Sequence, residues 1–193
     1  DQQALTEDND EEGSVLEGDH DGINDGSYAN ADARRAFRAI GALLSDRRCS
    51  LRVLDIGGDT CGYAVADELP PLLLNLARCK TLTSADVSGH SAGSSPGVLG
   101  ALLHLLRRSR SLRHLNLCRN GFDSASLRAI LGGWRRRNLT LQRLTLFAAD
   151  PREASHGRGG LPLDTAVELM DEAEQLSRRN RRLAEAMERE LSV

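Results

Sequence analysis

Apolar residues recur at the first, fourth and sixth positions of four short segments of the chain. The segments are residues 51–56, 82–87, 112–117 and 141–146, and their first leucines lie 31, 30 and 29 residues apart. Each segment is typical of a strand with one buried face. A constant period in this range predicts a stack of structural repeats.

Between these segments the apolar residues change to the spacing of an amphipathic helix. The three stripes are Val65, Leu69, Leu72 and Leu76; Val98, Leu102, Leu105 and Leu106; and Leu127, Ile130, Leu131 and Trp134. Two more stripes predict helices at the ends of the stack. The helix before the first strand carries Phe37, Ile40, Leu43 and Leu44. The helix after the last strand carries Val167, Met170, Ala173 and Leu176, and Asp164 is its expected N-cap. Each repeat is therefore predicted to be strand, turn and helix.

The copy at residues 112–120 resembles the leucine-rich-repeat motif LxxLxLxxN/C, with Leu112, Leu115, Leu117 and Asn120 in the motif positions. The other copies carry Asp59, His90 and Ala149 at the asparagine position. A period of about 29 residues with a full helix is similar to the ribonuclease-inhibitor-like subclass. The resemblance, which extends over residues 31–183, implies an α/β fold: a short leucine-rich-repeat solenoid with a parallel concave sheet and convex helices.

Composition divides the chain further. Residues 1–33 hold 11 of the 28 acidic residues and neither Lys nor Arg, so we predict a disordered acidic tail at 1–30. Residues Asp8 to Asp19 also match an EF-hand-like calcium loop, but its last position is Asp rather than Glu and no flanking helices are evident, so disorder is the preferred interpretation. A further hypothesis is that this tail folds back and masks basic residues elsewhere in the chain.

The solenoid is expected at residues 31–162, with an N-terminal helix and four repeats, and it ends in a Gly/Pro-containing loop at 149–162. Residues 163–193 are expected to form a C-terminal capping helix, because the last repeat of a solenoid needs a polar cover. Leu176, Leu183 and Met187 leave open a coiled-coil partner helix as the alternative.

In such a fold the residues between the motif leucines face outward, and equivalent positions form columns across the parallel strands. Three columns are predicted: Asp55, Asp86, Asn116 and Thr145; Val53, Ser84, His114 and Arg143; and Arg52, Thr83, Arg113 and Gln142. Phe147 is expected to be a rare exposed aromatic anchor near the sheet edge. The partner-binding candidates on the concave face are Asp55, Asp86, Arg113, His114, Asn116, Arg143, Thr145 and Phe147.

Basic residues precede every predicted strand. Six of them define what we call the basic ridge: Arg107, Arg108, Arg110, Arg135, Arg136 and Arg137. One interpretation is structural, because cations at helix C-termini complement the helix dipole. The other is a surface for an acidic partner or nucleic acid. Aromatic residues are only 3% of the chain, which weakens the case for stacking on single strands.

Catalysis is not expected. The adjacent carboxylates of Asp55 and Asp86 invite a general acid–base interpretation, but no nucleophile, metal-ligand cluster or phosphate-binding loop accompanies them. None of the four cysteines forms a CxxC pair, so neither a metal site nor a cofactor is predicted. Cys118 is expected to be exposed beside Arg119, either as a reactive thiol or as an ordinary cysteine. The glycosylation sequon at Asn138 is treated as chance.

The sequence therefore predicts a noncatalytic protein–protein interaction scaffold that binds its partner through the concave face. The alternatives are binding of an acidic partner or nucleic acid through the basic ridge, and regulation of a GTPase. We expect a cytoplasmic chain without a membrane span, either a monomer or a subunit of a larger complex. Ribonuclease inhibitors, tropomodulin and the Ran GTPase activator share this repeat without sharing an activity, so the resemblance does not identify the partner.

Overall fold

The computed structural model describes residues 25–58, 62–95, 97–147 and 161–192 of the 193-residue chain. In chain order the elements are α1 (Asp25–Ser45), β1 (Val53–Asp55), the 3-10 helix η1 (Gly62–Glu68), α2 (Leu69–Leu76), β2 (Ser84–Asp86), the 3-10 helix η2 (Ala92–Ser94), α3 (Val98–Arg108), β3 (His114–Asn116), α4 (Ser124–Arg137), β4 (Arg143–Thr145) and α6 (Leu163–Glu190). Strand and helix alternate as the repeat period predicts.

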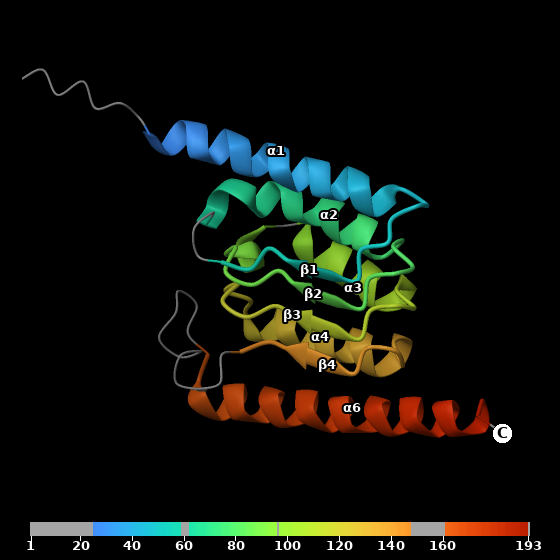
Figure 1. Cartoon of the computed structure of the whole chain (residues 1–193). Helices are drawn as coiled ribbons and strands as arrows, with labels where there is room; N and C mark the ends of the chain where they lie inside the picture. Colours follow the sequence, from blue (N-terminus) through green and yellow to red (C-terminus); the bar gives the residue numbers. More distant parts are fainter. Residues whose placement is uncertain (1–24, 59–61, 96, 148–160, 193) are drawn as a thin grey trace, which may run out of the picture.

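The four strands form one parallel sheet in the order β1-β2-β3-β4. Helices α2, α3 and α4 cover one face of this sheet, α1 packs on α2, and α6 lies beside β4 (Figure 1). Val53 pairs with Ser84, Ser84 with His114, and His114 with Arg143. The predicted register is therefore confirmed for the columns that begin with Val53 and Asp55.

The core lies between the sheet and its covering helices. Each three-residue strand buries its central residue and turns its two neighbours away from the helices. Trp134 is the largest fully buried side chain, and its Nε1 donates a hydrogen bond to the Leu141 carbonyl at 3.1 Å. This bond joins the last turn of α4 to the segment that leads into β4, so helix and strand of adjacent repeats are fixed together.

The turns after the strands are held by buried polar side chains. Asn120 is 2% exposed; its Nδ2 donates to the carbonyls of Val87 and Leu117, and its Oδ1 accepts from the N–H groups of His90 and Ala92. One repeat earlier, His90 Nε2 lies 2.8 Å from the Ile56 carbonyl oxygen. Since a carbonyl can only accept, Nε2 carries the proton, and His90 replaces one donor function of the motif asparagine.

The C-terminal helix continues this system of bonds. Asn180 on α6 is fully buried, and its Nδ2 donates to the carbonyls of Asn138 and Leu141 at 3.0 and 2.7 Å. Ion pairs Arg128–Glu168 and Arg135–Glu172 join the exposed sides of α4 and α6. Helix α6 therefore packs on the last helix and strand of the stack.

Several sequence-based expectations are wrong in detail. Helix α1 begins at Asp25, inside the segment predicted to be a disordered tail. Leu43 and Val167 were assigned to apolar stripes, yet they are 51% and 42% exposed. The N-cap of α6 is Pro162, and Asp164 lies in the first turn, where its charge still faces the positive end of the helix dipole. The calcium-loop hypothesis and most of the 149–162 loop fall outside the described residues.

Candidate interaction surfaces

At the carboxyl ends of the strands, the column of Asp55, Asp86 and Asn116 has a structural function. In each residue Oδ1 accepts a hydrogen bond from the N–H two residues later, at 3.1, 2.9 and 3.1 Å respectively. Such local bonds turn the chain sharply away from the strand. The sequence predicted the position of this column but not this role.

Asp86 is the most constrained member of the column. Its carboxylate also accepts from the Ser88 hydroxyl at 2.7 Å and from Asn116 Nδ2 at 2.7 Å. Burial alone would raise the pKa of Asp86, but the bonds from Ser88 and Asn116 and the nearby His90 together lower it. The carboxylate is therefore held ionised by its own repeat and the next one. This arrangement does not favour a general acid at Asp86, and a partner's cation is not needed to compensate its charge.

Other candidates on this face remain open to solvent. Val53 is 60% exposed, and Asp55, Arg113, His114 and Arg143 are exposed as well. Asn116 and Thr145 are half-buried. The face thus carries one carboxylate and an apolar side chain on β1, and cations on the β3 and β4 side.

Phe147 does not match its expected role. It is half-buried and packs against the hydrophobic core. An aromatic ring in this position stabilises the end of the last repeat, and the expectation that it forms an exposed anchor is wrong.

Cys118 was likewise expected to be exposed but is buried. The turn that contains it stacks on the preceding one, where the Gly89 N–H donates to the Cys118 carbonyl at 3.0 Å.

A hollow of about 290 Å³ lies where the sheet meets α6, lined by His114, Gln142, Arg143, Glu174, Ser177 and Arg181. Within it, Arg181 pairs with Glu174 at 3.1 Å. Nearby, Arg113 approaches Glu188 at 3.8 Å. The C-terminal helix therefore contributes both signs of charge to the border of the concave face, which the sequence did not indicate.

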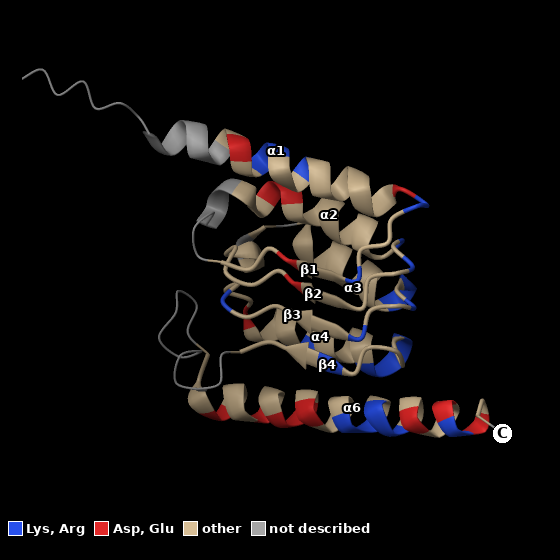
Figure 2. Cartoon of the chain, in the orientation of Figure 1, with Lys and Arg blue, Asp and Glu red and all other residues tan. Residues whose placement is uncertain are grey.

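The basic ridge runs along the edge where the helices end and the strands begin (Figure 2). Arg107 and Arg108 occupy the last turn of α3, and Arg135, Arg136 and Arg137 the last turn of α4. The structural interpretation through the helix dipole therefore fits their position. Arg135 pairs with Glu172, and Arg107 contacts His104, whereas four others make no hydrogen bond or ion pair with the described residues: Arg108, Arg110, Arg136 and Arg137.

The positive potential of this edge affects a neighbouring histidine. Burial, followed by the charges of Arg107, Arg108 and Arg78, lowers the pKa of His104. Arg107, Arg136 and Arg137 also line a hollow of about 580 Å³ between α3 and α4. Cations from two successive repeats therefore converge on one surface without a carboxylate in its lining.

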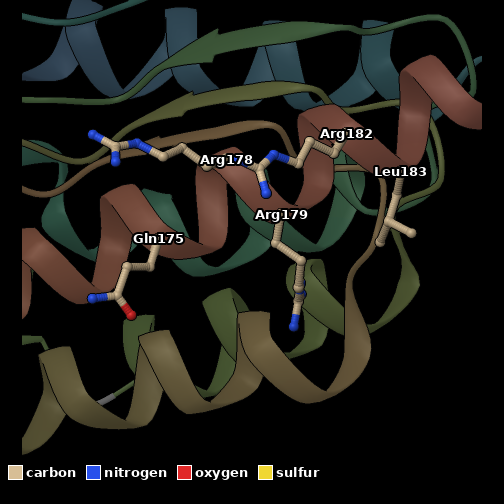
Figure 3. Close-up of a pocket in the computed structure, with 5 residues that line it drawn as sticks. All are labelled: Gln175, Arg178, Arg179, Arg182 and Leu183. Atoms are coloured by element: carbon tan, nitrogen blue, oxygen red, sulfur yellow. The ribbon is translucent and has the colours of Figure 1, made fainter.

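A second cationic hollow, of about 430 Å³, lies against α6 and is lined by Gln175, Arg178, Arg179, Arg182 and Leu183. Figure 3 shows Gln175 and Arg179 extending from α6 toward α4. Arg179 Nη1 donates to the Arg135 carbonyl at 3.2 Å, while its Nη2 is buried and has no hydrogen-bond partner among the residues that the structure describes. This hollow escaped the sequence analysis because its residues share one helix face but no motif.

Asn138, the first residue of the sequon, is 2% exposed. Its Nδ2 donates to the Leu106 carbonyl, and its Oδ1 accepts from the N–H groups of Thr140 and Leu141. An amide nitrogen in this position serves the fold and is not accessible for glycosylation.

Among the described residues, no group of three or more His, Cys, Asp or Glu is arranged to hold a metal ion. No described helix is both long enough and apolar enough to cross a membrane.

Comparison with known proteins places the fold within the leucine-rich-repeat-like class. The C-terminal domain of tropomodulin from Caenorhabditis elegans has a TM-score of 0.53 and 16% sequence identity, and the likeness covers 81% of this chain and 99% of that one. The parallel sheet and its helices fit a leucine-rich-repeat-like arrangement. No family model matches the chain.

One curated relative is the Rho GTPase-activating protein gacW of Dictyostelium discoideum. It is 32% identical over 128 residues, which is 65% of this chain. The match spans only 11% of that protein's length. The relative is therefore far larger than the region compared.

Proposed function

We propose that this chain is a noncatalytic scaffold that binds a protein partner through its concave face. The observation that carries the proposal is the open side of the sheet: α2, α3 and α4 all lie on the other side, and no described helix covers the concave one (Figure 1). The exposed Val53 supplies an apolar contact there, with charged residues around it. Protein interfaces typically combine apolar contacts with a polar rim.

The charges of this face favour a partner of mixed polarity. Asp55 lies at the β1 side, whereas His114 and Arg143 lie at the β3 and β4 side. A partner with a cation opposite Asp55 and a carboxylate opposite Arg143 would match both halves. Asp86 is not substituted in the experiment, because its replacement would break the turn after β2 and so disturb the fold as well as any contact.

The experiment compares two matched substitutions. Val53→Glu places a charge on the concave face, and Leu139→Glu places the same charge on a similarly exposed residue (57%) beside the basic ridge. Each variant is used to capture partners from native lysate, and the captured protein is then purified and titrated against both. We expect Val53→Glu to weaken binding at least tenfold and Leu139→Glu to leave it unchanged. The reverse pattern contradicts a concave binding site.

A second candidate function is regulation of a GTPase, and the observation that favours it is the similarity to the Rho GTPase-activating protein. The exposed Arg143 is the side chain to examine, because an arginine supplied in trans stabilises the charge that develops on the transferred phosphate. The test is single-turnover phosphate release from GTP-loaded Rho GTPases with the wild type and Arg143→Ala. Stimulation that is lost in the variant supports the function, and no stimulation across a panel counts against it.

A third candidate is recognition of an acidic partner or nucleic acid by the basic ridge. It is favoured by the four arginines whose side chains make no hydrogen bond or ion pair with the described residues. Binding of this kind weakens steeply with salt, because counterions are released. The double substitution Arg136→Glu with Arg137→Glu should abolish it, while Val53→Glu should not. Binding that is insensitive to both salt and the double substitution rejects this candidate.

We also propose that the repeats belong to the ribonuclease-inhibitor-like subclass and form a short solenoid in a cytoplasmic protein. The full helices α3 and α4, of 11 and 14 residues, support the subclass. The thiols of Cys49 and Cys79, which form no disulfide with each other in this structure, support a reducing compartment. Small-angle scattering of the full chain tests the shape, and fluorescence microscopy of a tagged chain tests the location.

A further inference from the structure

Two cysteines lie in adjacent turns that lead from a helix into a strand. Cys49 follows α1 and precedes β1, and Cys79 follows α2 and precedes β2; Cys79 is 30 residues later, one residue out of register with the 31-residue offset between β1 and β2. Ser109 and Asn138 fill the position of Cys79 in the next two repeats. There the side-chain oxygen accepts the N–H group of a leucine that leads into the strand, at 3.3 Å in Ser109 and 2.7 Å in Asn138.

The contacts of Cys79 bring the two thiols together. Its sulfur lies 3.5 Å from the Thr81 hydroxyl oxygen, and the N–H groups of Thr81 and Leu82 and the Cys49 thiol are near enough to it to lower its pKa. The same Thr81 hydroxyl donates to the Cys49 carbonyl at 3.1 Å and the Leu51 carbonyl at 2.9 Å. The two turns lead into the paired strands β1 and β2, and paired strands lie about 4.8 Å apart, which is within the range of Cα separations in disulfides, roughly 4.4–6.8 Å.

The surroundings favour thiolate chemistry. Burial alone would raise the pKa of Cys79, but the hydrogen bonds from Thr81, Leu82 and Cys49 together lower it. Cys49 and Cys79 both line a hollow of about 570 Å³, whose other charged residues are three cations, Arg47, Arg78 and Lys80, and one carboxylate, Asp46. Cys79 is 5% exposed and Cys49 is half-buried, so a small reagent can reach the pair while a protein thiol cannot approach Cys79 easily. Reactive cysteines are found in electropositive sites of this kind.

We propose that Cys49 and Cys79 are a site of reversible oxidation, at which a hydroperoxide converts the two thiols into an intrachain disulfide. The Cys79 thiolate attacks one oxygen of the hydroperoxide, the O–O bond breaks, and the other oxygen leaves as water or an alcohol after taking a proton. The resulting sulfenic acid on Cys79 is attacked by the Cys49 thiol. The S–S bond forms, the S–O bond breaks, and the hydroxyl leaves as water with the proton of Cys49.

This site is independent of the concave face and therefore goes beyond the proposed scaffold function. The disulfide would join the turn after α1 to the turn after α2. Because α1 packs on α2 and η1, the bond would fix the first helix to the repeat that it covers.

The test uses the full chain, treated with hydrogen peroxide at neutral pH, alkylated and digested for mass spectrometry. We expect one peptide pair, carrying Cys49 and Cys79, joined and two hydrogens lighter than the separate peptides, and restored by dithiothreitol. Cys118→Ser is the matched control. Cys118 is also buried, but it follows β3 instead of preceding a strand, so this variant should oxidise like the wild type. In Cys49→Ser, Cys79 should stop at a sulfenic acid that dimedone traps.

Three results would overturn the proposal. The first is that Cys49 and Cys79 both remain alkylated as free thiols under conditions that oxidise glutathione. The second is that either cysteine pairs mainly with another cysteine or between chains. The third is that the wild type and Cys49→Ser give the same dimedone adduct at Cys79, because the second thiol would then play no part.

Discussion

The contribution of Asn120 to stability follows from its four hydrogen bonds. Asn120→Ala leaves the N–H groups of His90 and Ala92 without their side-chain acceptor. It also leaves the carbonyls of Val87 and Leu117 without their side-chain donor, in a site that excludes solvent. At about 1 kcal/mol for each bond, and with one contact as long as 3.3 Å, the loss should be about 3–4 kcal/mol.

Urea unfolding followed by circular dichroism measures this loss, with the slope of the transition compared between variants. Asn116→Ala is the matched control: this asparagine also bonds to Cys118 N–H and Asp86, but it is half-buried, so water can replace the lost partners. We expect the control to lose about 1 kcal/mol. If Asn120→Ala loses no more than Asn116→Ala, the reasoning that buried turn contacts hold the repeats together is refuted.

Burial lowers the pKa of His90, so the unfolded chain takes up the proton first as pH falls below about 6.5, and stability is lost below that pH. His90→Asn should flatten this loss in unfolding curves measured between neutral and mildly acid pH, and an unchanged slope would contradict the assignment. Gly100→Ala, with open space around the new Cβ in α3, should stabilise the chain by about 0.5–1 kcal/mol, whereas Gly93→Ala would place its Cβ 2.4 Å from the Gly121 carbonyl and should lower the melting temperature. Trp134→Phe should cost about 1–3 kcal/mol in urea unfolding, because it removes one of the two donors to the Leu141 carbonyl and leaves the fully buried site of the indole underfilled; a neutral effect would contradict the packing described.

The sequence predicted the strand register because the repeat period leaves little freedom. Once Leu54, Ala85, Leu115 and Leu144 are placed at the buried position, parallel pairing aligns every flanking residue. Even Ala85, which breaks the leucine pattern, could be assigned to the buried position from its distance to the neighbouring repeats. The confirmed columns therefore follow from the repeat period alone.

Exposure at the ends of the stack could not be read from that pattern. Leu43 and Val167 keep helical spacing, but each terminal helix contacts the stack on one side only, so the width of its buried stripe is smaller. Phe147 and Cys118 lie in turns, whose burial depends on the neighbouring repeat rather than on local sequence. The proximity of Cys49 and Cys79 does not follow from the period, because Cys49 is one residue out of register with the 31-residue offset between β1 and β2.

The position of Asn180 has a consequence for solution behaviour. The last strand of a parallel sheet presents unpaired backbone groups that can recruit another chain, which is a common route to aggregation. By donating to the carbonyls of Asn138 and Leu141, α6 occupies the approach to β4 with side chains instead of a further strand. A chain shortened before α6 would expose the edge strand β4 and should aggregate more readily. The helix therefore keeps the protein monodisperse in addition to stabilising the fold.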